Sequence, residues 1–109
     1  MRYSTVAFVG IIFAPALAAA KTFNIDIVDY KFDPAELVIN AGDEVIWNSK
    51  AYARHDVVQG SSCKSGGIFA STTISNGGKF SHTFNQAGTY PYFCTPHCSS
   101  RMEGKITVK

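Results

Sequence analysis

The sequence predicts an all-β domain, a sandwich of about seven or eight short strands. The first observation is alternation of apolar and polar residues, clearest in Thr22–Val28 and Lys79–Phe84. Such a period of two is typical of a strand with one buried face. The second observation is that turn residues separate the runs, and the third is that no segment has a helical period. Short strands at turn-separated intervals indicate a sandwich or barrel.

The expected strands follow one another with recognisable breaks. Phe32-Asp33-Pro34 interrupts the chain after the first run, and Ala41-Gly42-Asp43, Asn76-Gly77-Gly78 and Gln86-Ala87-Gly88 are turn sequences. From Gly60 to Gly78 the composition shifts to Gly, Ser and Thr, which predicts an irregular connection with one short strand inside it. The strands are therefore expected at 22–28, 36–40, 44–48, near 68–73, and at 79–84, 89–94 and 105–109.

The first 20 residues are expected to be a secretory signal peptide, followed by one domain over residues 21–109. Met1-Arg2 gives a positive start, Val6 to Ala18 is almost wholly apolar, and Ala16 to Ala20 supplies small residues at cleavage-site spacing. The alternative is a membrane anchor, but the apolar run is short for a span and contains Pro15. The mature protein is thus expected to be secreted, extracellular and without a membrane anchor.

The charge pattern excludes some classes of partner. Ten Lys and Arg against eight Asp and Glu give a formal net charge of +2, with no basic run or acidic tail. Nucleic acid or a charged membrane surface therefore has no support as a partner.

The residues with metal chemistry gather near the C-terminus. Cys94, His97 and Met102 offer a thiolate, an imidazole and a thioether within one short segment, and His55 can supply a second imidazole. One thiolate and two imidazoles with a long axial thioether are the ligands of an electron-transfer copper site. Zinc is the main rival, because it also takes Cys and His, but it rarely uses a thioether. One copper ion is the expected cofactor.

Three cysteines in an exported chain leave one without a partner in any single disulfide. If Cys94 binds metal, Cys63 and Cys98 are free to pair. The alternative is a Cys94–Cys98 or Cys63–Cys94 bridge with no metal, which leaves His97 and Met102 without a role.

A resemblance to a known family rests on four segments of the sequence. These are Phe32-x-Pro34, Gly42-Asp43-x-Val45-x-Trp47, His55-x-Val57 and Gly88-Thr89-Tyr90-x-Tyr92-x-Cys94-x2-His97-x4-Met102-x-Gly104. The chain resembles the cupredoxins, the small blue copper proteins, and the plastocyanin-like members most closely. The position of Cys98 directly after His97 is similar to plant phytocyanins and small fungal secreted cupredoxins.

The resemblance implies an eight-stranded Greek-key sandwich with copper at one end. It implies His55, Cys94 and His97 as equatorial ligands and Met102 as the weak axial one. The implied function is one-electron transfer through the Cu(I)/Cu(II) couple.

Some residues beside the expected ligands are candidates to adjust the site, and some positions depart from the family pattern. Asp56 and Thr95 are the candidates for hydrogen bonds that join the His55 segment to the Cys94 segment. The family usually has Asn where Asp56 stands, and an ionised Asp56 is expected to lower the reduction potential. Plant plastocyanins have a Tyr where Phe93 stands, together with an acidic patch, so that docking route is not expected. Pro91 is unusual within a strand unless it lies at an edge or bulge.

Three functions are compatible with the residues to different degrees. The first is a monomeric electron carrier whose redox partner, an unidentified protein or enzyme, docks near His97. The second is an extracellular copper-sequestering protein without a dedicated redox partner. An enzyme is disfavoured, because three histidines cannot build additional copper centres and cleavage exposes Lys21 rather than a chelating His. His82 is expected to have a packing or surface role, and Trp47 to lie in the core.

Overall fold

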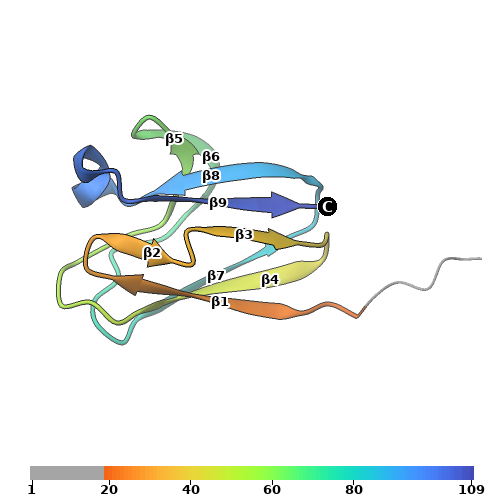
Figure 1. Cartoon of the computed structure of the whole chain (residues 1–109), viewed down its shortest axis with the longest axis horizontal. Coiled ribbons are helices and arrows are strands. Elements are labelled where there is room, and N and C mark those ends of the chain that lie inside the picture. The colour runs from red at the N-terminus through yellow and green to blue at the C-terminus, as the bar shows by residue number, and fades with distance from the viewer. Residues whose placement is uncertain (1–18) are drawn as a thin grey trace, which may run out of the picture.

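The computed structural model describes residues 19–109, so the predicted signal peptide lies outside the described residues except for its last two. The described chain forms nine strands and one short 3-10 helix, η2 (Figure 1). The strands are β1 (Thr22–Val28), β2 (Lys31–Asp33), β3 (Glu36–Ile39), β4 (Asp43–Ser49), β5 (Val58–Ser61), β6 (Lys64–Ala70), β7 (Lys79–Phe84), β8 (Gly88–Phe93) and β9 (Glu103–Val108); η2 is Thr95–Ser100.

The strands form a sandwich of two sheets, which confirms the predicted fold class. One sheet has the order β2-β1-β4-β7 and the other the order β3-β9-β8-β5-β6. β1 runs parallel to β4, with Ile25 opposite Trp47, and β3 runs parallel to β9. The connections β1–β2, β4–β5 and β8–β9 all lie at one end of the sandwich, the left end in Figure 1.

The alternation that predicts the strands also explains the core. In β4, burial alternates residue by residue, and Val45 and Trp47 have no exposed surface. Trp47 packs edge-on against Tyr92 of the opposite sheet, with ring centroids 5.3 Å apart. The predicted core position of Trp47 is therefore correct. His82, the residue with a predicted packing or surface role, lies between Phe69 and Phe84, each with its centroid 4.7 Å away.

The prediction of an irregular connection from Gly60 to Gly78 is wrong in its first half. There the structure has the β5–β6 hairpin, which pairs Ser61 with Lys64, and β6 ends at Ala70, halfway through the strand expected near 68–73. The hairpin turns at Ser62 and Cys63, whose φ values are 53° and 60°. Two left-handed central residues suit a tight hairpin, but Gly, Asn or Asp normally marks that turn. Neither residue gives that signal.

β2 is also absent from the predicted strands. The chain reverses after β1 and pairs Phe32 with Ile27, so the expected break is a three-residue strand. Phe32 is 2% exposed, and its burial holds this short strand against the core.

Pro91 lies inside β8, where it faces Lys105 of β9. β5 pairs with β8 only at Phe93 and Tyr92, so Pro91 has no partner residue in β5. A proline is tolerated on such a locally unpaired side because no ladder hydrogen bond is lost there. Within the described residues, the chain contains no helix with the length and apolar character that crossing a membrane requires.

Candidate metal centre

The segment after β8 is a closed loop that carries three of the predicted ligands. The Cys94 amide donates a hydrogen bond to the carbonyl of Met102 at 3.0 Å, which joins the two ends of the loop. Inside it, the His97 amide bonds to the Cys94 carbonyl at 3.2 Å, and Pro96 stands in the first turn of η2. Proline suits this position because the first amides of a helix have no internal partner.

The fourth predicted ligand, His55, comes from the connection between β4 and β5. Its backbone pairs with Ile74 in an isolated bridge, with hydrogen bonds of 3.1 and 2.7 Å in the two directions. The side chain is fully buried. A ligand outside regular structure is thus held by a two-way backbone contact.

The structure brings the predicted ligands together. The Nδ1 atoms of His55 and His97 lie 3.5 and 3.4 Å from the sulfur of Cys94. All three atoms lie within 4.8 Å of one another. Met102 is fully buried in the same core cluster as Cys94.

The donor set fits copper. One sulfur and two imidazole nitrogens converge, with a thioether-bearing residue buried beside them, and these are soft or borderline donors. Among residues 19–109, no carboxylate belongs to the converging group, which consists of His55, Cys94 and His97. Of the three histidines in the chain, two are in this group and His82 packs between phenylalanines.

Burial sets the protonation of the site before a metal binds. It raises the pKa of the Cys94 thiol, while the backbone amides of Asp56 and His97 oppose that rise to a smaller extent. It also lowers the pKa of His55, against the opposing hydrogen bond to Asp29. Both shifts favour uncharged side chains, so metal binding must release the thiol proton.

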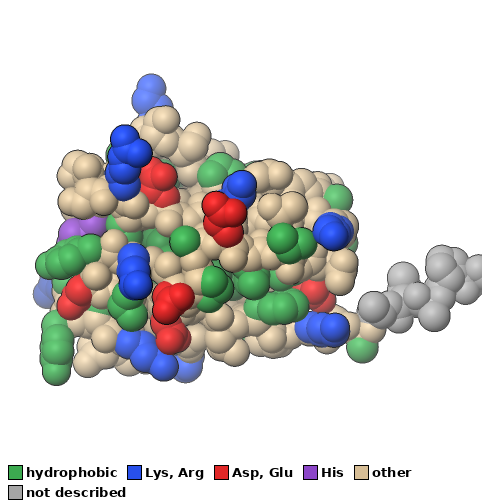
Figure 2. Space-filling model, in the orientation of Figure 1, with side chains coloured by type: hydrophobic (Ala, Val, Ile, Leu, Met, Phe, Trp, Pro, Cys, Tyr) green, Lys and Arg blue, Asp and Glu red, His purple; other side chains and the backbone are tan. Residues whose placement is uncertain are grey.

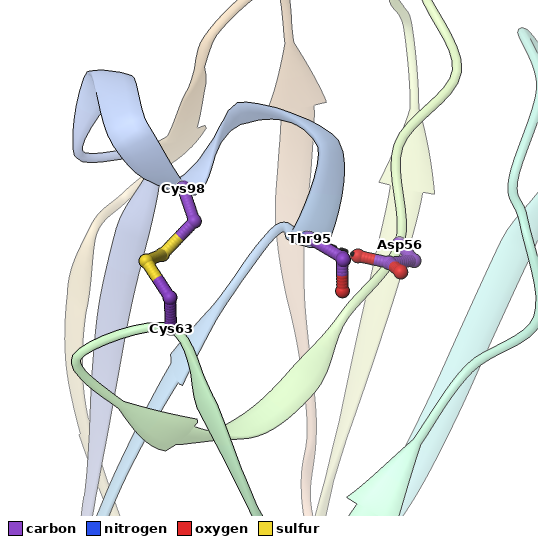
Figure 3. The surroundings of a disulfide bond; sticks show 4 residues. All are labelled: Asp56, Cys63, Thr95 and Cys98. Carbon is purple, nitrogen blue, oxygen red and sulfur yellow. Dashed lines mark hydrogen bonds between the residues drawn. A yellow bond between two sulfur atoms is a disulfide. The ribbon is translucent and has the colours of Figure 1, made fainter.

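Asp56 and Thr95, the residues expected to join the two ligand segments, are in contact. The Thr95 amide donates a 2.6 Å hydrogen bond to Oδ1 of Asp56, drawn as the dashed line in Figure 3. The donor is the backbone of Thr95, so this contact does not require a threonine side chain.

A disulfide joins Cys63 to Cys98 (Figure 3), and Cys94 is a free, buried cysteine. The alternative pairings through Cys94 are therefore not those of the structure. The bridge ties the tip of the β5–β6 hairpin to η2, one residue after His97. Behind the loop, Gly104 lets the ring of Tyr92 pack close to the backbone, because a Cβ at position 104 would clash with the hydroxyl of Tyr92.

Two neighbours of the centre have no counterpart among the predicted residues. Oδ1 of Asp29 lies 3.4 Å from Nε2 of His55 and also accepts a 3.3 Å hydrogen bond from the Ala53 amide. The ring of Tyr30 packs edge-on against His97, with centroids 4.9 Å apart. Both belong to the β1–β2 turn, and only the packing of the sandwich places that turn beside the loop.

Residues 19–109 match the family of copper-binding proteins described as the plastocyanin/azurin family. The chain belongs to this family. Its cofactor is one copper ion, and it is a cupredoxin. Among its relatives, amicyanin of Paracoccus denitrificans is 33% identical over 102 residues, which are 89% of this chain and 72% of that protein. The chloroplastic plastocyanin of Tetradesmus obliquus is 33% identical over 72% of this chain, and the match spans 58% of that protein's length.

Solved structures show the same fold. A purple cupredoxin from Nitrosopumilus maritimus superposes with a TM-score of 0.73 at 26% identity, over 80% of this chain and 99% of that one. A mutant of amicyanin in its Cu(I) form gives a TM-score of 0.70 at 30% identity, over 81% of this chain and 82% of that one.

Proposed function

We propose that the mature cupredoxin, Lys21 to Lys109, is a secreted type 1 copper protein that transfers single electrons. His55, Cys94 and His97 are the equatorial ligands, and Met102 is the weak axial ligand. The observation that carries this proposal is the convergence of two Nδ1 atoms and one thiol sulfur within 4.8 Å. When bound, copper supplies a one-electron couple between Cu(I) and Cu(II).

The protein's contribution is a site that changes little between the two states. Four backbone hydrogen bonds lie within the ligand loop, and the disulfide and the Asp56–Thr95 contact attach it to two other segments. Because His55 is also held by a paired bridge, none of the ligand segments depends on side-chain packing alone. A small rearrangement of the site on gain or loss of an electron favours fast electron transfer. Contacts such as these, made to the residues that bind a metal rather than to the metal itself, orient the ligands.

Electrons are exchanged at the His97 end. His55, Cys94 and Met102 have no exposed surface, whereas His97 is half-buried. Figure 2 shows a histidine at the end of the sandwich that carries the ligand loop, with hydrophobic side chains on one side of it. An unidentified redox protein or enzyme docks there on a monomeric carrier, and the protein catalyses no reaction of its own.

Voltammetry and electron self-exchange of the copper-loaded Lys21–Lys109 protein test this function against copper sequestration. An electron carrier is expected to give a reversible one-electron wave and fast self-exchange between the Cu(I) and Cu(II) forms. Tight binding of Cu(I) alone, without a reversible wave, would contradict the carrier function and support sequestration.

A further inference from the structure

The ring of His97 has fewer restraints than the ring of His55. Its Nδ1 faces the sulfur of Cys94 at 3.4 Å, but within residues 19–109 its Nε2 has no hydrogen-bond partner. His55, in contrast, is fully buried and has Asp29 at its Nε2. The orientation of the His97 ring therefore depends on the rings that pack against it.

Tyr30 provides the contact on the outer side of His97. The two rings meet edge-to-face at 70° with centroids 4.9 Å apart, and Tyr30 also lies 6.3 Å from the His55 ring. The His55 and His97 rings are 4.7 Å apart, so the three rings form one cluster. Tyr30 remains 56% exposed, which places it between the imidazoles and solvent.

The backbone of Tyr30 is strained. Its φ of 73° lies in the left-handed region, which Gly or Asn adopts at a lower cost than an aromatic residue. Strained residues of this kind are found at functional sites more often than elsewhere. Gly would form this turn with less strain than Tyr. The reason for a tyrosine at this position is therefore its ring and not its backbone conformation.

We propose that Tyr30 is a positioning residue for His97. Its ring holds the imidazole with Nδ1 directed at Cys94 and shields the ligand from water, which slows loss of copper through this exposed side. This inference rests on the proposed function, because it assumes that His97 binds copper.

The test compares Tyr30→Gly and Tyr30→Phe with wild type. Copper-loaded protein is mixed with excess EDTA, and copper release is followed by the visible absorption. An edge-to-face pair of rings contributes enough to predict release about two- to tenfold faster in Tyr30→Gly. Tyr30→Phe keeps the ring and is expected to stay within about twofold of wild type.

Ser62→Gly is the matched control, because Ser62 has a φ of 53° in another exposed turn. It relieves the same kind of strain without removing a ring, so its release rate should equal that of wild type. Tyr30→Asn, which also tolerates this conformation, replaces Tyr30→Gly should that variant not fold. The proposal would be overturned if the ring-free variants released copper at the wild-type rate. It would also be overturned if Tyr30→Phe released copper as fast as the ring-free variants.

A second readout needs no copper. In NMR spectra of the copper-free protein, the ring protons of His97 should be shifted by the Tyr30 ring in wild type and Tyr30→Phe, and lose that shift in Tyr30→Gly. Unchanged shifts would contradict the contact itself. Absence of a copper absorption band from wild type would instead contradict the proposed function, so the two failures are distinct.

Discussion

At the scale of single residues, the two imidazoles are held by different means. His55 has a carboxylate at its outer nitrogen, since Oδ1 of Asp29 lies 3.4 Å from Nε2. A carboxylate at this place fixes the tautomer that leaves Nδ1 free for a metal and makes the ligand more basic. His97 has no carboxylate in this place, and its ring packs against the ring of Tyr30. The charge of Asp29 therefore acts through the buried ligand.

Asp29→Asn is expected to raise the reduction potential, because the lost negative charge stabilises Cu(II) more than Cu(I). A partly exposed charge contributes on the order of 1 kcal/mol, which is about 40 mV for one electron. Copper affinity should fall about 10- to 100-fold. Voltammetry and a chelator competition measure the two effects.

Asp26→Asn is the control for Asp29→Asn. It removes the same charge from β1, where Asp26 pairs with Lys50 and does not contact His55. Equal shifts in potential from both variants would show that only the overall charge matters, and would contradict a specific role for Asp29.

At the scale of elements, the disulfide makes one unit of the β5–β6 hairpin and η2. Cys98 is 7% exposed and packs with Val58 and Phe93 in a small second core. Because Cys98 follows His97 directly, the same bond that stabilises the fold also restrains the ligand loop.

The double variant Cys63→Ser/Cys98→Ser is expected to lose about 3.5–4 kcal/mol of unfolding free energy, since the closed loop spans 35 positions. Denaturant titration of the copper-free protein measures the loss, and Ser99→Ala serves as an exposed neighbouring control. A midpoint equal to that of wild type would show that the loop is held without the bridge.

At the scale of the whole molecule, cleavage of the predicted signal peptide is expected to affect the stability of the sandwich. The Lys21 amide donates a 2.9 Å hydrogen bond to Oδ1 of Asp43, and the Asn40 amide bonds to Oδ2 at 2.9 Å. The two hydrogen bonds lower the pKa of the Asp43 carboxyl below its usual 3.8, and the bond from Asn40 has the larger effect. If cleavage follows Ala20, the nitrogen of Lys21 becomes a charged ammonium beside this carboxylate.

The Lys21–Lys109 protein is therefore expected to be more stable at neutral pH than the same chain extended by Ala19-Ala20. A depressed carboxyl pKa contributes stability above the unfolded value, and that contribution is lost as the pH falls through the folded value. The advantage should thus begin to decline on acidification below about pH 3.8, the usual pKa of this carboxyl, and vanish once the pH lies below the lowered pKa of the folded protein. Thermal unfolding across pH measures it.

Asp43→Asn is the matched control for this prediction, and it should show no difference between the two lengths. A neutral-pH advantage that persists in Asp43→Asn would contradict the role of the carboxylate.

The sequence predicts most of the sandwich because alternation reports burial directly, as in β1, β4 and β7. It fails at the β5–β6 hairpin, where Ser62 and Cys63 turn the chain without Gly or Asn, and at β2, whose burial depends on Phe32 alone. The metal-binding residue types and their spacing predict the centre. Asp29 and Tyr30 could not be predicted, because they approach the histidines only after two sheets pack together.

The most direct test of the central claim is a visible absorption spectrum of the Lys21–Lys109 protein during titration with Cu(II). We expect an intense thiolate-to-copper band towards the red end that saturates at one copper per chain. Cys94→Ser should abolish the band, whereas His82→Ala, which alters the histidine packed between Phe69 and Phe84, should keep it. No band in wild type, or a band that survives in Cys94→Ser, would contradict a copper centre built on Cys94.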